Sequence, residues 1–278
     1  MSLPVISLAV NFLLFLFGTI IGSFLNVVAI RYNSGKGILG RSACMSCNKK
    51  LCWYELVPVL SFCALGGKCL MCKSRISAQY PIVEILSGLG FVLLYHKWLY
   101  LFPSFGLFLF VLLFSFMLYS LLLVIAVYDF RHRIIPDALV FAFVILSGLF
   151  LFVSKSSFGD FLVIPSFMSF LAGPLVAAPF ALIWLVSRGR WMGLGDAKLM
   201  LGAGFLLGLA SGYAAVLLSF WIGGLISLFL LVFFRKYFSM KSEIPFAPFL
   251  ILSVMLVFLF GIDFFGIMNL LNFSNGIF

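Results

Sequence analysis

Two aspartates, Asp129 and Asp196, are candidates for chemistry because only 8 of the 278 residues are acidic. Asp196 lies in residues 189–202 (GRWMGLGDAKLMLG), with long apolar sequence on both sides. A carboxylate within a membrane is costly, so a functional role is its default explanation. Gly193 and Gly195 remove side chains just before Asp196, which lets a backbone or a substrate come close. The alternative is an ordinary turn between helices, with Asp196 as N-cap and the glycines as turn residues.

Asp129 directly follows the uncharged run 98–128. We expect it at the C-terminal end of a helix, where a negative charge opposes the helix dipole. Asp137, by contrast, follows Pro136 in the first turn of the next helix, where capping or the dipole explains it. Because the helix dipole disfavours a negative charge at the position of Asp129, this residue is expected to have a functional role. Two neighbouring carboxyls share a proton, so one acts as base on water and the other as acid on a peptide carbonyl. The sequence therefore predicts an aspartyl dyad of Asp129 and Asp196.

All six cysteines fall within 31–80, the one sizeable polar segment. Four of them form two CxxC pairs separated by 21 residues, namely Cys44 and Cys47, then Cys69 and Cys72. This spacing predicts a closed, structural zinc site of four thiolates. Disulfides are the alternative, but the segment is strongly basic, which places it in the cytoplasm, where disulfides are rare. Cys52 and Cys63 have no CxxC partner and are interpreted as ordinary small apolar residues.

Two polar residues near this segment are further candidates. Asn26 shares a helix face with Gly22 and Ser23, a pattern typical of helix–helix packing, and a binding role is its alternative. Glu84 lies one turn into a membrane run, so it is either a first-turn acid favoured by the helix dipole or a site residue facing the cytoplasm.

Three residues are grouped with the aspartates as supporting residues. Lys198 follows Asp196 by two positions. Pro245 and Pro248 lie three residues apart and are expected to interrupt a helix where it enters the membrane. Non-helical backbone inside a membrane is stable only where it contacts protein or a water-filled cavity. Here its N–H and C=O groups can form hydrogen bonds with an extended substrate.

Composition identifies the elements that must position these residues. Hydrophobic residues make up 64% of the chain and charged residues 9%, which excludes a soluble globular protein. We predict an all-α polytopic membrane protein with about eight transmembrane helices, since the apolar runs reach the ~20 residues that cross a bilayer and only 138–154 is slightly short. The run 199–234 is long enough for two helices with a hinge at Ser211–Gly212. The runs are 1–30, 76–96 with Glu84 inside it, 98–128, 138–154, 161–187, 199–234 and 244–262.

The net charge of +10 follows from the topology and does not require nucleic acid. In the eight-span interpretation, 16 of the 18 Lys and Arg residues lie on one side, and only Lys97 and Lys155 lie on the other. The positive-inside rule then places the basic loops in the cytoplasm and both termini outside. Residues 1–30 lack a basic leader and a small-residue cleavage site, so a cleaved signal peptide is not expected.

Five motifs together resemble those of one family, and they extend over nearly the whole chain from Gly22 to Pro248. They are Asp129-x6-Pro-Asp, Gly-x-Gly-Asp196-x-Lys-Leu, the two CxxC pairs, Tyr-Pro-x-Val-Glu84 and Pro-Phe-x-Pro. In these motifs the chain resembles the bacterial type IV prepilin peptidases, which are GxGD-type aspartic proteases of the membrane.

The resemblance implies both an activity and a location. The family cleaves the leader of prepilins and pseudopilins at the cytoplasmic face of the bacterial inner membrane, and many members then methylate the new N-terminus with S-adenosylmethionine. Asp129 and Asp196 would be the catalytic pair and the four paired cysteines the metal ligands. Glu84 would be a methylation residue. Asn26 is grouped with it because both flank segment 31–80, the only polar surface large enough for the cofactor.

This interpretation divides the chain into residues 1–100, with the cysteine segment and methylation, and residues 101–278, the aspartic peptidase. Substrate pilins and membrane lipid would be its partners. Two alternatives remain, a presenilin-like intramembrane protease and a transporter with buried carboxylates. The large CxxC segment favours the prepilin branch over the first. The placement of both aspartates near helix ends, and not at the bilayer midplane, argues against the second.

Overall fold

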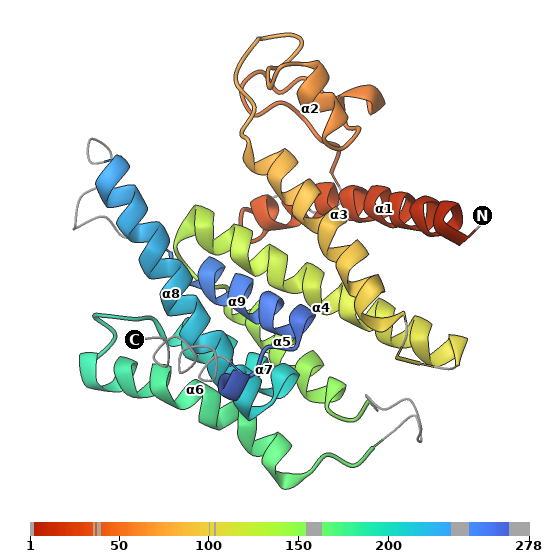
Figure 1. Cartoon of the computed structure of the whole chain (residues 1–278). Helices are drawn as coiled ribbons and strands as arrows, with labels where there is room; N and C mark the ends of the chain where they lie inside the picture. Colours follow the sequence, from red (N-terminus) through yellow and green to blue (C-terminus); the bar gives the residue numbers. More distant parts are fainter. Residues whose placement is uncertain are drawn as a thin grey trace, which may run out of the picture. The chain divides into compact units, whose positions relative to one another are not determined.

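The computed structural model describes residues 3–35, 37, 40–99, 101–102, 104–153, 163–234 and 245–266. Within these residues the chain is helical and contains no strand, which confirms the predicted fold class (Figure 1). The helices of at least 14 residues are α1 (Leu3–Arg31), α3 (Gln79–Trp98), α4 (Phe105–His132), α5 (Asp137–Phe150), α6 (Phe167–Ser187), α7 (Leu194–Leu207), α8 (Leu209–Phe233) and α9 (Ala247–Phe260). Two short helices, η1 (Trp53–Glu55) and α2 (Leu60–Ala64), lie in the cysteine segment.

The described helices are those of a multi-pass membrane protein. Four are long and apolar enough to cross a bilayer, namely α1 from Ser7, α4, α6 and α8, while α5 and α9 are shorter apolar helices. Part of the predicted charge pattern cannot be placed, because Lys155 and the basic loop with Arg235, Lys236 and Lys241 lie outside the described residues.

The chain divides into two compact units, and α4 contributes to both. The first comprises Met1–Tyr100 and Leu112–Val127, and the second comprises Leu101–Val111 and Tyr128–Phe278. The predicted activities of residues 1–100 and 101–278 remain predictions.

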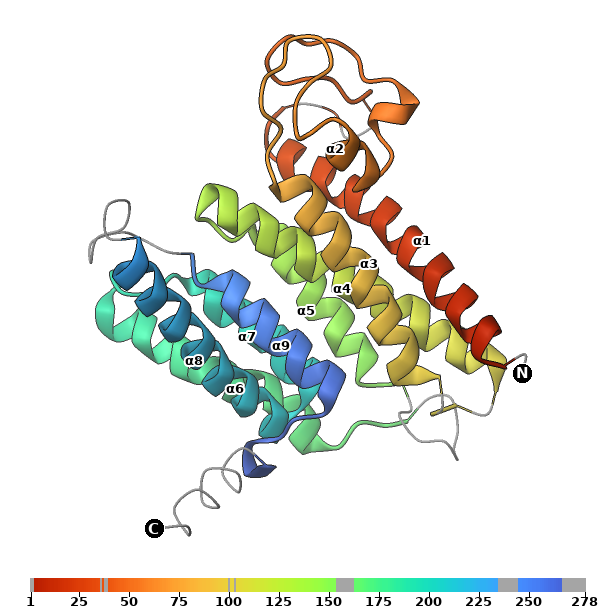
Figure 2. The same cartoon turned by 45° about the horizontal axis from the view of Figure 1, so that its top comes forward.

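In the first unit, α1 and α3 lie side by side because small residues line their contact (Figure 2). A Cβ atom added to Gly18 would come within 2.7 Å of the Gly88 Cα, and one added to Gly22 within 2.8 Å of the Glu84 Cα. Close backbone approach of this kind is how helices associate in lipid, where apolar side chains gain little by contact alone. The contact places the second turn of α3 directly against α1.

In the second unit, α7 packs against α5, α6, α8 and α9. A Cβ atom on Gly204 would lie 2.6 Å from the Ala172 carbonyl oxygen of α6, so this contact also depends on glycine. The core of the unit includes Phe143 and Met200, both fully buried. A packed, rigid α7 therefore carries the GxGD stretch.

The run 199–234 forms two helices, but the predicted hinge at Ser211–Gly212 is wrong. The break lies at Gly208, whose φ of 82° and ψ of −179° separate α7 from α8. That conformation is open in practice only to glycine. Gly212 lies inside α8, where an added Cβ would meet Val176 of α6 at 2.6 Å, so its role is close packing.

The prediction that two prolines interrupt the last helix also needs correction. Pro245 precedes α9, Phe246 is its N-cap, and Pro248 occupies the second helical position. Proline is tolerated in the first turn because the N–H it lacks would have no intrahelical partner. The two prolines therefore start α9 at Ala247 and do not break it.

Candidate functional site

Asp129 lies in the last turn of α4, as the sequence predicted. The helix ends there because Arg133 adopts a left-handed conformation and donates its N–H to the Asp129 carbonyl oxygen at 2.7 Å. Asp129 is only 5% exposed. Its carboxylate accepts the backbone N–H of Ala247, the first residue of α9. That N–H has no partner within its own helix, so the positive end of α9 supplies Asp129 with a donor.

Asp196 is the third residue of α7, and its N-cap is Gly193. The alternative interpretation, in which Asp196 itself caps the helix, is therefore wrong. Asp196 is 7% exposed, and its Oδ1 atom is buried without a hydrogen-bond partner in the described residues. Asp129 and Asp196 are close enough to repel each other electrostatically. The structure thus brings together two buried carboxylates from separate helices.

The two glycines before Asp196 have different roles. A Cβ atom added to Gly195 would lie 2.9 Å from the Ile135 Cβ, so the loop between α4 and α5 can reach α7 only if residue 195 lacks a side chain. Gly193 has an extended backbone, and an added Cβ there would have only the Gly195 nitrogen nearby, at 3.9 Å. Gly195 is therefore the glycine that the packing requires.

Lys198 points away from the aspartate pair. Its Nζ atom lies 2.7 Å from Oδ1 of Asp137 and 5.2 Å from the centre of the Phe141 ring, both on α5. Two residues along a helix turn the side chain about 200°, so Lys198 and Asp196 lie on opposite faces of α7. Lys198 supports the site by joining α7 to α5.

One donor in this site was not foreseen from the sequence, the Ala247 N–H. The signal was present in the Pro-Phe-Ala-Pro pattern, since prolines in a first helical turn mark a helix N-terminus with free N–H groups.

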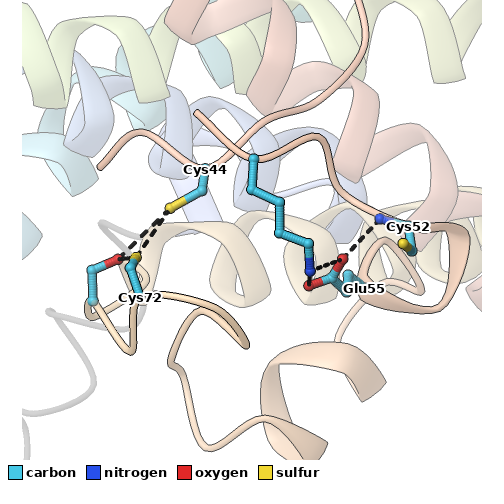
Figure 3. Close-up of polar contacts among 6 residues, drawn as sticks. Cys44, Cys52, Glu55 and Cys72 are labelled. Atoms are coloured by element: carbon cyan, nitrogen blue, oxygen red, sulfur yellow. Dashed lines mark hydrogen bonds and ion pairs between the residues drawn. The ribbon is translucent and has the colours of Figure 1, made fainter. Parts of the chain in front are cut away.

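The four paired cysteines form a second cluster, in the first unit. Their Sγ atoms all lie within 4.8 Å of one another. Figure 3 shows two of the four, Cys44 and Cys72, whose Sγ atoms are 3.8 Å apart. A tetrahedral zinc ion with Zn–S bonds of about 2.3 Å requires sulfur atoms about 3.8 Å apart. A disulfide would need about 2 Å. The arrangement fits a four-thiolate metal site and not disulfides.

The two CxxC loops that supply these thiols have the same local structure. In each, the residue after the second cysteine is left-handed, Asn48 with φ 55° and Lys73 with φ 56°. Each loop is closed by one antiparallel bridge, Ala43 with Lys50 and Lys68 with Arg75. The cysteines of the two loops face each other, as expected for one metal ion that is bound by two CxxC loops.

The electrostatics of the thiols also favour a cation. Backbone N–H groups of Cys47 and Ser46 lower the pKa of Cys44 to about 6. Although the Lys49 N–H favours the Cys47 thiolate, burial and the neighbouring cysteines raise the pKa of Cys47 to about 11. Four thiolates this close need a metal to balance their charge. The hydroxyl of Ser74, 3.0 Å from the Cys72 sulfur, is a further polar contact that the sequence did not reveal.

Cys52 and Cys63 lie outside this cluster, as predicted. The N–H of Cys52 donates to Glu55 at 2.8 Å, and Glu55 in turn pairs with Lys49 at 3.3 Å (Figure 3). These contacts hold the chain between the two CxxC loops.

Asn26 and Glu84 are buried where α1 meets α3. The amide nitrogen of Asn26 donates to the carbonyl oxygens of Gly22 and Tyr80, at 3.3 Å each. Oε2 of Glu84 accepts the backbone N–H of Val59 at 2.7 Å. Both side chains join elements of the first unit, which is the packing role expected of Asn26. Their assignment to methylation stays a prediction.

These features define a multi-pass membrane protein with a buried aspartate pair and a four-cysteine site of the metal-binding type. The chain belongs to the type IV leader peptidase family, whose model matches residues 116–228, including both aspartates. The model of the bacterial peptidase A24 N-terminal domain matches residues 16–98, including the cysteine cluster.

Curated relatives are similar to this chain over most of its length. The prepilin leader peptidase/N-methyltransferase of Bacillus subtilis (strain 168) is 31% identical over 257 residues, covering 90% of this chain and 94% of the relative. The protein of the same name from Pseudomonas putida is 30% identical over 276 residues, 88% of each chain. That from Vibrio cholerae serotype O1 is 30% identical over 258 residues, 86% of this chain and 92% of the relative. No solved structure was found to match.

Proposed function

We propose that this chain is a prepilin leader peptidase that also methylates the N-terminus it creates, as the names of its relatives state for those proteins. The observation that carries the peptidase function is the pair of buried carboxylates, Asp129 and Asp196, one of which has an unpartnered oxygen. A buried carboxyl without a hydrogen-bond partner is costly, so its presence here indicates a functional role.

The surroundings of the two carboxyls support different roles. A hydrogen bond donated to a carboxylate stabilises its ionised form, and Asp129 receives one from Ala247 at the positive end of α9. Oδ1 of Asp196 has no donor, and Asp129 repels its negative charge. Asp129 is therefore the base that takes a proton from water, and Asp196 is the acid that protonates the peptide carbonyl.

The substrate would be a prepilin or pseudopilin, whose apolar segment can lie in the lipid beside the enzyme. The family relationship supports a bacterial inner-membrane protein, and the pattern of basic residues supports a site at the cytoplasmic face and both termini outside. Both aspartates lie within the first or last turn of a helix, which fits cleavage at a membrane boundary.

The four cysteines would hold zinc, whose contribution would be structural because four protein ligands leave no open position. The ion would hold the segment between α1 and α3 folded. Asn26 and Glu84 already make hydrogen bonds within the chain, to Gly22 and Val59, which supports a positioning role for both side chains. We propose methylation on the family relationship alone and place it in residues 1–100.

The proposal is tested by incubating the purified protein with a prepilin, with and without S-adenosylmethionine, and following both products by mass spectrometry. Asp129→Asn and Asp196→Asn should each abolish cleavage, while Asp137→Asn should retain it. Full cleavage by either dyad variant would refute the assignment. Cleavage without methylation by the wild type would limit the function to the peptidase.

A further inference from the structure

A short stretch of the cysteine segment, residues 53–60, carries several exposed apolar side chains close together in the sequence. Trp53 is 79% exposed and Leu60 66%, and Tyr54 and Leu56 between them are also exposed. Exposed aromatic and aliphatic side chains gathered in one place mark an interaction site. We refer to this stretch as the 53–60 segment.

One hydrogen bond fixes the 53–60 segment to a membrane helix. The N–H of Val59 donates to the Glu84 carboxylate of α3 at 2.7 Å. Around Glu84, α3 turns a row of apolar side chains outward, beginning with Ile82 and continuing through Ile85 to Leu89. In the predicted membrane run 76–96 such a row suits contact with lipid, and the attachment point then lies near the start of that run.

The backbone at the attachment point is strained. Val59 has φ 60° and ψ −52°, and the Leu60 N–H donates to the Pro58 carbonyl oxygen at 2.5 Å, which makes a γ-turn of the rare form. A β-branched residue adopts positive φ only where its surroundings hold it there. The Glu84 hydrogen bond is such a restraint, and it directs the 53–60 segment toward α3.

The charged residues around the 53–60 segment are almost all basic. Glu55 is the only acid in residues 31–75, and it is buried and paired with Lys49. Exposed cations surround the stretch in the sequence, namely Arg41, Lys50, Lys68, Lys73 and Arg75. Such a surface is complementary to anionic lipid headgroups.

We propose that the 53–60 segment inserts into the headgroup region of an anionic membrane, on the side where α1 ends and α3 begins. Trp and Tyr favour this depth because their rings are apolar while their N–H and O–H groups need water. The membrane is favoured over a soluble partner because the cysteine segment follows α1, a candidate membrane span that ends at Arg31, and continues into the predicted membrane run of α3, which begins at Gln79. The inference does not depend on the proposed enzymatic activity.

The test uses the full-length protein in lipid nanodiscs, with Trp53 as the reporter. The chain has five tryptophans, so the Trp53 signal is the difference between the wild type and Trp53→Phe. Lipids brominated near the top of the acyl chain should quench most of this signal, and lipids brominated deeper should quench less. Acrylamide in the water should have little effect on it. Retained metal content in Trp53→Phe would show that the cysteine cluster is intact.

The charge argument is tested by comparing phosphatidylglycerol-containing nanodiscs with pure phosphatidylcholine. Quenching should be stronger with the anionic lipid, and high salt should reduce it, because salt screens headgroup attraction. A Trp53 signal that acrylamide quenches and brominated lipids do not would overturn the proposal. So would a signal that changes only when a prepilin peptide is added, which would assign the 53–60 segment to the substrate. Equal quenching in both lipids at every salt concentration would overturn the choice of an anionic surface.

Discussion

The ammonium group of Lys198 lies 2.7 Å from the carboxylate of Asp137, although Asp196 is only two residues away in the sequence. Lys198 lies in the second turn of α7 and Asp137 in the first turn of α5, so the ion pair joins the two helices on the face of α7 opposite Asp196. The lysine of the GxGDxK stretch therefore does not supply a positive charge to the aspartate pair and acts on the position of α7.

Removing this ion pair should have a small effect. The Asp137 side chain is 62% exposed, and exposed ion pairs contribute only about 0.2–1 kcal/mol. Asp137→Asn and Lys198→Met should each lower the unfolding temperature slightly and leave most cleavage activity, and the double variant should be no worse than either alone. Thermal unfolding in detergent and a prepilin cleavage assay would measure both effects. A loss of cleavage as complete as that of Asp196→Asn would show that Lys198 acts on the dyad.

The two glycines of the GxGD stretch offer a matched comparison. An alanine at position 195 places its Cβ 2.9 Å from that of Ile135, and overpacking of this kind costs about 1–3 kcal/mol. Gly195→Ala should therefore displace the start of α7 and reduce cleavage strongly. Gly193→Ala should retain most activity, because the site is extended and open. Equal losses in both variants would mean that the glycines matter for a reason other than packing against Ile135.

Metal content tests the cysteine cluster. We expect about one zinc ion per purified chain, bound by four thiolates. Cys44→Ser or Cys72→Ser should lose the metal and make residues 31–80 sensitive to protease, since a small metal-held segment unfolds without its ion. Cys63→Ser is the control, because Cys63 is exposed and outside the cluster. A metal-free, reduced wild type whose segment still resists protease would contradict the zinc assignment.

Much of this architecture could be predicted from the sequence because the lipid bilayer permits few backbone structures. Long uncharged runs must be helices, so the eight long helices of the described residues and the positions of Asp129 and Asp196 near helix ends follow from hydropathy. Paired CxxC spacing likewise limits the four thiols to one neighbourhood.

The remaining features depend on tertiary contacts that local patterns do not contain. The choice of Gly208 over Gly212 as the break between α7 and α8 depends on the contact between Gly212 and Val176 of α6. The bond between Glu84 and Val59 joins residues 25 positions apart, and the donor is a backbone group that any residue could supply. No residue-type signal can reveal such a partner.

That bond gives Glu84 a testable positioning role. Glu84→Ala removes the acceptor for the Val59 N–H, whereas Glu84→Gln keeps an acceptor oxygen without the charge. We expect faster hydrogen exchange across residues 53–60 and reduced methylation in Glu84→Ala, with smaller changes in Glu84→Gln and cleavage retained in both. Mass spectrometry can follow exchange and both products. Loss of methylation in Glu84→Gln with unchanged exchange would instead show that the carboxylate takes part in methyl transfer.

The proposed division of roles within the dyad can be tested with two reagents of opposite preference. Epoxides alkylate ionised carboxylates, whereas diazo esters react with protonated carboxyls. The Ala247 N–H stabilises a charge on Asp129, and Asp196 has an unpartnered oxygen, so the shared proton should reside on Asp196. The epoxide should therefore modify Asp129 and the diazo ester Asp196, as peptide mapping would show, and either modification should inactivate the enzyme. Asp196→Asn should still react with the epoxide at Asp129, and Asp137→Asn should give the wild-type pattern. Modification of Asp196 by the epoxide and of Asp129 by the diazo ester would reverse the assignment of acid and base. Two neighbouring carboxyls that share one proton offer one ionised group and one protonated group, so each reagent should find a target in the dyad. Labelling of Asp137 alone would therefore refute the dyad.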